Sequence, residues 1–179
     1  LKRIPYGDAA ALEAAITPNT AAFLVEPIQG EGGIIIPPEG YLAACAEICK
    51  RHNVLLIADE VQTGLGRTGH LLATQHDRIR PDGVILGKAL GGGLLPVSAF
   101  LADERVMQVF KPGDHGSTFG GNALSAAVAA EALEVLVDER LVERSAALGA
   151  MLLARLHEIA AATPLIRAIR GRGLFAGIE

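Results

Sequence analysis

The stretch DGVILGKALGGGLLPVSAF, residues 82–100, sets a lysine directly behind a short apolar run. Val84, Ile85 and Leu86 are typical of a buried strand, and Lys88 follows after a single glycine. More glycines stand at 91–93 and leave space around this lysine. Because lysine is almost never buried without a partner or a function, the end of this strand is a candidate site.

Similar apolar runs occur on both sides of this stretch. Uninterrupted runs rich in Val, Ile and Leu predict strands at 21–28, 54–58, 82–86 and 95–102. The pair Pro37-Pro38 predicts the start of a helix that ends near residue 52, and Ala/Leu/Glu-rich segments predict long helices at 123–137 and 141–161. Buried strands that alternate with helices are typical of α/β proteins, so we expect a parallel or mostly parallel sheet covered by helices on both faces. The last helix leads out to a further domain, with a first strand expected within 166–179.

The charge and composition argue against two classes of partner. The net charge is −4, and basic residues do not cluster with aromatic ones, which argues against nucleic-acid binding. No apolar run approaches the roughly 20 residues that span a bilayer, so no membrane partner is expected. The two cysteines, Cys45 and Cys49, are too few for a metal site, and we interpret them as reduced thiols in the core of a cytoplasmic protein. Because the chain begins LKRIPYGD and ends GRGLFAGIE within an apolar run, we interpret it as an internal segment of a longer polypeptide.

Charged residues follow each of the first three predicted strands. Glu26 closes the first, Asp59 and Glu60 close the second, and Lys88 follows the third. Ligands of open α/β sheets bind beyond the carboxyl ends of the strands. Charged groups that converge at one edge of an apolar sheet are unfavourable unless they meet one another or a ligand. We therefore expect these side chains to form one site.

Two of these residues have a structural alternative to a chemical role. Lys88 can be a lysine whose head reaches water, whereas a phosphate loop is excluded because the glycine spacing is wrong and Ala89 stands where Ser or Thr would hold magnesium. The chemical alternative is an amine with a pKa lowered by desolvation, able to form a Schiff base with a carbonyl. Asp59 can cap the next turn, or it can keep the ring nitrogen of an aldehyde cofactor protonated, with the amide of Gln62 near the same ring. The loop HGSTFGGN at 115–122 offers the hydroxyls of Ser117 and Thr118, together with backbone N–H groups, to a phosphate.

Four motifs together resemble the class III, pyridoxal-phosphate-dependent aminotransferases. They are VEPIQGEGG at 25–33, LLIADEVQTGLGRTG at 55–69, DGVILGKALGGGLLPVSAFLAD at 82–103 and KPGDHGSTFGGNALSAAVAAEALEVL at 111–136. The resemblance covers essentially the whole chain in the same order. It implies the type I fold of the aspartate aminotransferase superfamily, with residues 1–138 as the second part of the large, cofactor-binding domain. Residues 139–179 would then be a connecting helix and the beginning of the small C-terminal domain.

The resemblance also implies a role for each candidate residue. Lys88 would be the Schiff-base lysine for pyridoxal 5'-phosphate and Asp59 the partner of its pyridine nitrogen, with Gln62 at its phenolic oxygen. Ser117 and Thr118 would bind the phosphate held by the other subunit of a homodimer with shared active sites. Glu26 would line the substrate-binding wall, and Glu31 would be the gating glutamate that pairs with an arginine, for which no counterpart is found in these residues. The family's phosphate loop and ring-stacking aromatic residue have no counterpart here either.

The segments GKALGGGLLPVSA and EGGIIIPPEGYL are most similar in sequence to the ornithine-specific members of the family. This implies transfer of the δ-amino group of ornithine to a 2-oxo acid such as 2-oxoglutarate, which gives glutamate semialdehyde. Members acting on acetylornithine or 4-aminobutyrate are the alternatives within the family. A non-catalytic fragment that lacks half of the site is the alternative outside it.

Overall fold

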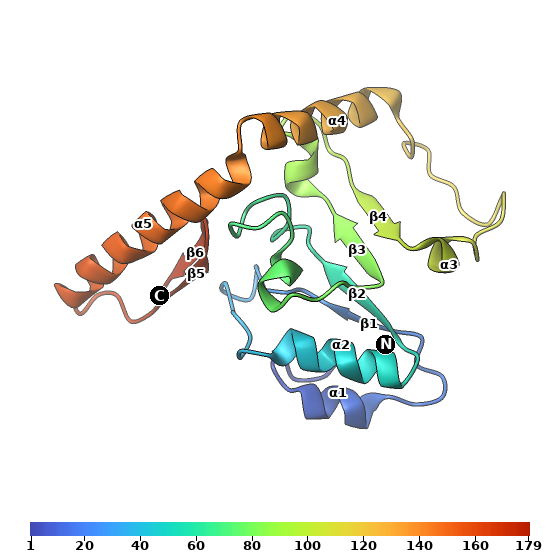
Figure 1. Cartoon of the computed structure of the whole chain (residues 1–179), viewed down its shortest axis with the longest axis horizontal. Helices are drawn as coiled ribbons and strands as arrows, with labels where there is room; N and C mark the ends of the chain where they lie inside the picture. The colour runs from blue at the N-terminus through green and yellow to red at the C-terminus, as the bar shows by residue number, and fades with distance from the viewer.

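A computed structural model describes all residues 1–179, and at its centre lies a four-stranded mixed sheet (Figure 1). The strands are β1 (Ala22–Val25), β2 (Leu55–Asp59), β3 (Gly83–Leu86) and β4 (Ala99–Ala102). They stand in the order β1-β2-β3-β4, with β1, β2 and β3 parallel and β4 antiparallel to β3. The mostly parallel α/β sheet predicted from the apolar runs is therefore confirmed. Each strand lies at the predicted place, although β1 and β4 are shorter than their apolar runs.

Two helices cover one face of the sheet and form the core with it. They are α1 (Ala9–Ala15) and α2 (Tyr41–Arg51), and the buried cluster joins Leu42 and Cys45 of α2 to Val25 and Leu56 of the strands. Helix α1 was not expected from the sequence, although Asp8 caps it by accepting a hydrogen bond from the backbone N–H of Ala11 (2.9 Å). The predicted start of α2 at the two prolines was wrong by one turn, because a turn over 38–41 precedes the helix.

The other face of the sheet is left largely open within these residues. Leu24 and Phe100 are exposed, and Ile57, which lies beside Leu24 in the register, is only half-buried. We expected helices on both faces, because the strands are apolar along their whole length. In this chain the helices cover only the face that carries Leu56 and Ala58.

Helices α4 (Ala123–Asp138) and α5 (Leu141–Ala161) match their predicted bounds to within one residue. Figure 1 shows them end to end along one side of the molecule, with a break between them. At the break, Arg140 takes a left-handed backbone conformation (φ 51°), which is incompatible with a continuous helix. The short helix α3 (Glu104–Met107) follows β4, and the 3₁₀ turns η1 (Ala73–Asp77) and η2 (Lys88–Gly91) complete the central part.

The C-terminal segment forms a hairpin of β5 (Ile169–Arg172) and β6 (Phe175–Ile178). We expected a single strand here, but Gly173 takes a positive φ of 55° and reverses the chain. The hairpin packs on the loop after β2, where the Leu174 N–H donates to the carbonyl oxygen of Arg67 (3.0 Å). A Cβ on Gly173 would lie 2.4 Å from the carbonyl carbon of Thr68, so only glycine fits this contact. The division into domains at residue 138 stays a prediction.

None of the helices has the length and apolar character needed to cross a membrane.

Candidate functional site

The charged residues predicted to converge do lie at the carboxyl edge of the three parallel strands. Asp59 is the last residue of β2, Glu26 follows β1 directly, and Lys88 stands two residues beyond β3. Asp59 pairs with Ile85 in the register of β2 and β3. Because parallel strands end at the same edge, the topology alone brings these side chains to one place.

A continuous series of contacts joins four of the predicted residues. The Gly30 N–H donates to Oε2 of Glu26 (3.0 Å). A Cβ on Gly30 would lie 2.6 Å from Nε2 of Gln62, so the Gln62 side chain lies directly against the Gly30 backbone. Nε2 of Gln62 donates to Oε1 of Glu31 (3.1 Å), and the same oxygen lies 3.9 Å from Nζ of Lys88. Residues from three loops, which are far apart in the sequence, therefore form one polar cluster.

Lys88 has an unusual backbone and an accessible amine. Its φ is 42°, in the left-handed region that few residues other than glycine adopt. This conformation turns the chain from the extended Gly87 into η2 and presents the side chain at the sheet edge. The Lys88 side chain is 57% exposed, so the desolvation that we expected around its amine is absent among these residues.

Asp59 makes the turn-capping contact and leaves its other oxygen free, so its role beside a cofactor ring stays a prediction. Its Oδ1 accepts a hydrogen bond from the Val61 N–H (3.1 Å), which is the predicted turn-capping contact. Its other carboxylate oxygen accepts no hydrogen bond from the chain, and the residue is half-buried. One oxygen of Asp59 is thus fixed by the turn while the other stays available to a ligand.

The glycines at 91–93, which we expected to leave space around Lys88, also have a packing role. Gly91 is buried beside Val97, and a Cβ on Gly92 would lie 3.2 Å from the Cβ of Ala132 in α4. Gly93 alone has no atom within 4 Å of its Cβ position. Because they lack a side chain, two of the three glycines therefore allow η2 to pack closely against its neighbours.

Ser117 and Thr118 are not brought to this edge. Both are exposed, and Oγ of Ser117 accepts a hydrogen bond only from the nearby Gly120 N–H (3.1 Å). The segment between α3 and α4 extends away from the sheet (Figure 1). Their role as phosphate ligands stays a prediction.

Glu60, which we expected in the same site as Asp59 and Lys88, has a structural role instead. It is 1% exposed, and its carboxylate accepts hydrogen bonds from Oγ1 of Thr63 (2.5 Å) and from the N–H groups of Ala73 (3.0 Å) and Thr74 (2.9 Å). These bonds close the loop 61–72, which carries Gln62, onto the end of β2. The one sequence signal for this is a carboxylate followed three residues later by a threonine, which is too common to be specific.

The same loop contacts a half-buried histidine. Nε2 of His76 lies 3.1 Å from the carbonyl oxygen of Thr68, and the His76 ring meets the His70 ring edge to face at 4.3 Å between centroids. Burial, together with the smaller effect of the Arg172 charge, lowers the pKa of His76 to about 4. The neutral ring therefore belongs to the packed contact between this loop and the C-terminal hairpin.

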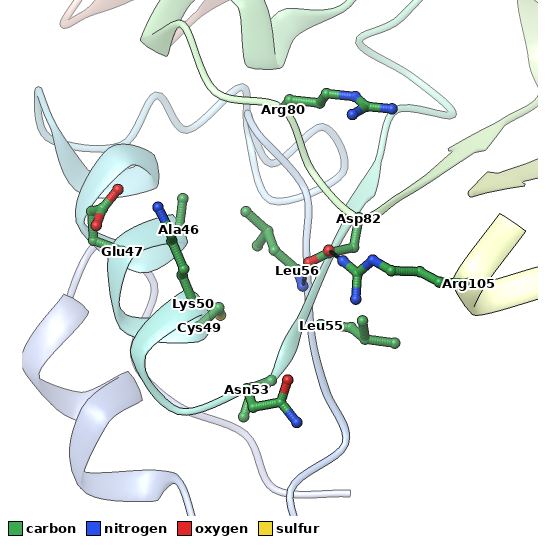
Figure 2. Close-up of a pocket in the computed structure, with 11 residues that line it drawn as sticks. Ala46, Glu47, Cys49, Lys50, Asn53, Leu55, Leu56, Arg80, Asp82 and Arg105 are labelled. Atoms are coloured by element: carbon green, nitrogen blue, oxygen red, sulfur yellow. Dashed lines mark hydrogen bonds and ion pairs between the residues drawn. The ribbon is translucent and has the colours of Figure 1, made fainter. Parts of the chain in front are cut away.

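A pocket of about 420 Å³ lies at the opposite, amino-terminal edge of the strands (Figure 2). Three of its charged groups are paired: Asp82 accepts from Arg105 and from the Leu56 N–H (2.9 Å), and Arg80 pairs with Asp103 (2.6 Å). Asp82 thus has a structural role in holding β2, β3 and α3 together. No three His, Cys, Asp or Glu side chains are grouped in a way that could bind a metal ion.

Comparisons with known proteins agree with the geometry of the carboxyl edge. The family model described as aminotransferase class-III matches residues 5–179. The ornithine aminotransferase of Bacillus subtilis is 60% identical over 179 residues, which is 100% of this chain and 44% of that protein. The solved ornithine aminotransferase of Toxoplasma gondii superposes with a TM-score of 0.95 at 54% identity, over 98% of this chain and 42% of that one. The acetylornithine aminotransferase of Elizabethkingia anophelis gives a TM-score of 0.96 at 54% identity, over 99% of this chain and 45% of that one.

The chain spans less than half the length of the curated relatives that it matches. Its α/β sheet and the order of its elements are those of the type I aminotransferase fold. The agreement extends over almost every residue, including all four motifs noted in the sequence. The chain belongs to the class-III aminotransferase family.

Proposed function

We propose that the protein containing this chain is a pyridoxal-phosphate-dependent aminotransferase that moves the δ-amino group of ornithine to a 2-oxo acid, with 2-oxoglutarate as acceptor and glutamate semialdehyde as product. The curated relatives at 58–60% identity are named ornithine aminotransferases. The Toxoplasma gondii relative holds pyridoxal phosphate at its active site with partial occupancy. The observation that carries the proposal is the cluster of Glu31, Gln62 and Lys88 beside Asp59 at the carboxyl edge of the sheet.

The residues present fit the cofactor. Lys88 has an accessible amine on a strained backbone, which is typical of functional positions. The free oxygen of Asp59 and the nearby carboxylates of Glu26 and Glu31 outnumber this one amine, so the edge favours a further cationic group such as a protonated ring nitrogen. In the proposal Lys88 attaches the cofactor, Asp59 faces its ring nitrogen and Gln62 its phenolic oxygen. The cofactor, when bound, supplies an electron sink for the substrate carbon.

Each protein group then has one task. Asp59 keeps a negative charge beside the ring nitrogen, and the Val61 N–H holds the carboxylate in place. The Lys88 amine, once free, moves a proton at the reacting carbon as a general base and acid. Glu26 lines the substrate side and orients the 30–35 loop through the Gly30 N–H.

Glu31 supports a donor that reacts through a terminal amine. Its Oε1 lies 3.9 Å from Nζ of Lys88, where the reacting amine of the donor must arrive. A carboxylate at that place repels the α-carboxylate of an α-amino acid, but not the δ-amine of ornithine, which has no carboxylate nearby. Glu31 must therefore be neutralised or displaced when a 2-oxo acid binds.

Acetylornithine is the second candidate donor. It also reacts through a δ-amine, and the solved acetylornithine aminotransferase is as similar to this chain as the Toxoplasma gondii ornithine enzyme, each at 54% identity. No contact in this chain distinguishes the free α-amine of ornithine from an acetylated one. 4-Aminobutyrate stays a third possibility within the family.

We further propose a homodimer in which Ser117 and Thr118 reach the cofactor phosphate of the second subunit. The loop that carries them also exposes large apolar side chains, Val109, Phe110 and Phe119. Exposed apolar clusters of this kind are typical of protein–protein contacts. The division of the chain into a large-domain part (1–138) and the beginning of a small domain (139–179), and a cytoplasmic location, are parts of the same proposal.

A substrate panel on the full-length protein tests the proposed reaction. Single-turnover rates with ornithine, acetylornithine and 4-aminobutyrate are measured after loading with pyridoxal phosphate, by loss of the visible absorption band. We expect the fastest reaction with ornithine, followed by transfer to 2-oxoglutarate. A fastest reaction with acetylornithine would move the assignment to the second candidate. If the absorption band persists with every donor, the non-catalytic alternative is the one that remains.

A further inference from the structure

The loop 30–35, which carries Glu31, is held in a strained backbone conformation. Gly33 has a φ of 111° and Ile34 a φ of 55°. A β-branched residue in the left-handed region is a genuine outlier, because its Cβ substituents crowd the backbone. Such strain persists only where surrounding contacts enforce it.

Part of the restraint comes from within the loop. The N–H groups of Gly33 and Ile34 both donate to the carbonyl oxygen of Gly30, at 3.0 and 3.2 Å. Gln29 and Ile35 form an isolated antiparallel bridge with two hydrogen bonds of 3.1 and 2.9 Å. These contacts close the base of the loop. The Gly33 carbonyl and the Ile34 side chain, at its tip, are contacted by another part of the chain.

The tip is held by the hairpin of β5 and β6, more than 130 residues away in sequence. Nε of Arg170 donates to the carbonyl oxygen of Gly33 (3.1 Å). Nη1 of Arg170 is held in turn by Oε2 of Glu179 (2.8 Å). A Cβ on Gly177 would lie 2.9 Å from Cγ1 and 3.1 Å from Cβ of Ile34, so the β6 backbone presses directly on the strained residue.

We infer that Arg170 is a positioning residue for Glu31, and that the β5–β6 hairpin sets the enzyme's preference for donors that react through a terminal amine. With the loop tip fixed, the Glu31 carboxylate stays at Gln62 and beside the Lys88 amine. Release of the tip lets the loop relax from its strained conformation, and Glu31 leaves the place where it repels an α-carboxylate. The inference rests on the proposed function for the role of Glu31, but the contact between hairpin and loop is independent of that function.

Two variants break the contact from the hairpin side. Arg170→Met keeps much of the length of the side chain and removes the donor to Gly33. Gly177→Ala adds a methyl group where Ile34 must lie and leaves Arg170 in place. Arg167→Met is the matched control, because Arg167 lies in the same segment and its side chain forms no hydrogen bond or ion pair. Arg170→Lys can still donate one hydrogen bond to the carbonyl.

The first measurement is hydrogen exchange, by mass spectrometry, of the peptide that covers 29–36 in the full-length protein without substrate. We expect exchange at Gly33, Ile34 and Ile35 to become about fivefold faster in Arg170→Met, the factor that corresponds to one net hydrogen bond. Gly177→Ala should show an increase of similar size. Arg167→Met should equal the wild type, and Arg170→Lys should stay closer to the wild type than Arg170→Met does.

The second measurement is the ratio of single-turnover rates with ornithine and with glutamate. We expect this ratio to fall about fivefold in Arg170→Met and in Gly177→Ala, in line with the loosened loop, and to stay unchanged in Arg167→Met. Unchanged exchange in both variants, faster exchange with an unchanged ratio, or an Arg170→Lys variant equal to Arg170→Met would each overturn the inference. A wild-type protein that does not react with ornithine would refute the proposed function instead, and the exchange result would then decide the inference alone.

Discussion

Glu26, Asp59 and Lys88 lie at one edge of the sheet because each stands at or just after the end of a parallel strand, and this grouping follows from the sequence alone. Topology brings such residues together whatever the details of packing. The detail that could not be predicted is the exposure of Lys88, since it depends on which segments cover the amine. The role of Glu60 could not be predicted either. Its partners Ala73 and Thr74 contribute only backbone N–H groups, which every residue except proline has.

At Asp59 we predict that substitution by asparagine lowers the turnover rate by at least about a hundredfold, with a smaller loss of cofactor affinity. A neutral amide can keep the hydrogen bond from Val61 but cannot hold a ring nitrogen protonated, and a preorganised charge in an active site typically contributes a few kcal/mol. Steady-state rates and cofactor titration of the full-length protein check this. A variant that keeps near wild-type turnover would reduce Asp59 to a turn cap.

Glu60 gives a stability prediction. Glu60→Ala leaves two backbone N–H groups and one hydroxyl without acceptors in a buried place, so the free energy of unfolding should fall by roughly 3 kcal/mol or more. Glu60→Gln, which retains one acceptor oxygen, should lose less. Glu47→Ala, an exposed glutamate of α2, is the control and should change stability by less than about 0.5 kcal/mol. Urea unfolding measures all three, and a loss below about 1 kcal/mol in Glu60→Ala would contradict the network described here.

Among the elements, the long helices were predicted best. The bounds of α4 and α5 follow from Ala/Leu/Glu-rich composition, and Asn122 caps α4 by accepting from the Ser125 N–H (2.9 Å). Strands β1 and β4 were placed correctly but predicted too long, because an apolar run continues beyond the last ladder hydrogen bond. The β5–β6 hairpin was read as one strand, since its reversal depends on Gly173 and on the surface that it docks against.

The contact between the 61–77 segment and this hairpin should weaken in acid. The pKa of His76 is about 4 in the folded chain against an ordinary 6.5, so between these pH values the unfolded chain binds a proton that the folded chain does not. The free energy of unfolding must therefore fall as pH drops from 6.5 to 4, by at most about 1.4 kcal/mol per pH unit from this one group.

Urea unfolding of the wild type and of His76→Gln across this range measures the effect. The difference between the two unfolding free energies should change with pH only below about 6.5, because the glutamine does not titrate. A difference that is constant from pH 7 to pH 4 would show that His76 is not the group responsible.

On the scale of the whole molecule, this chain provides one edge of a site and leaves much apolar surface uncovered. The open face of the sheet and the segment between α3 and α4 both expose large apolar side chains. Their partners could not be predicted from the sequence, because they are not among these residues. The proposed homodimer accounts for the second of these surfaces.

Mixed dimers test whether Thr118 serves the second subunit. Full-length chains with Lys88→Ala or Thr118→Ala, each first shown to be impaired alone, are unfolded and refolded together. If Thr118 acts across the dimer, one of the two sites in each heterodimer regains both residues, and activity should return to about half of the wild-type value per heterodimer. If it acts within its own subunit, every site keeps one lesion, and verified heterodimers would recover no activity.

The central claim is that Lys88 is the amine that holds the cofactor at this sheet edge. The most direct measurement is borohydride reduction of the full-length protein loaded with pyridoxal phosphate, followed by peptide mapping with mass spectrometry. We predict that the reduced adduct is found on Lys88, that the visible absorption band disappears on reduction, and that Lys88→Ala gives neither band nor adduct while it remains folded. A stoichiometric adduct on another lysine, with Lys88 unmodified, would contradict the claim.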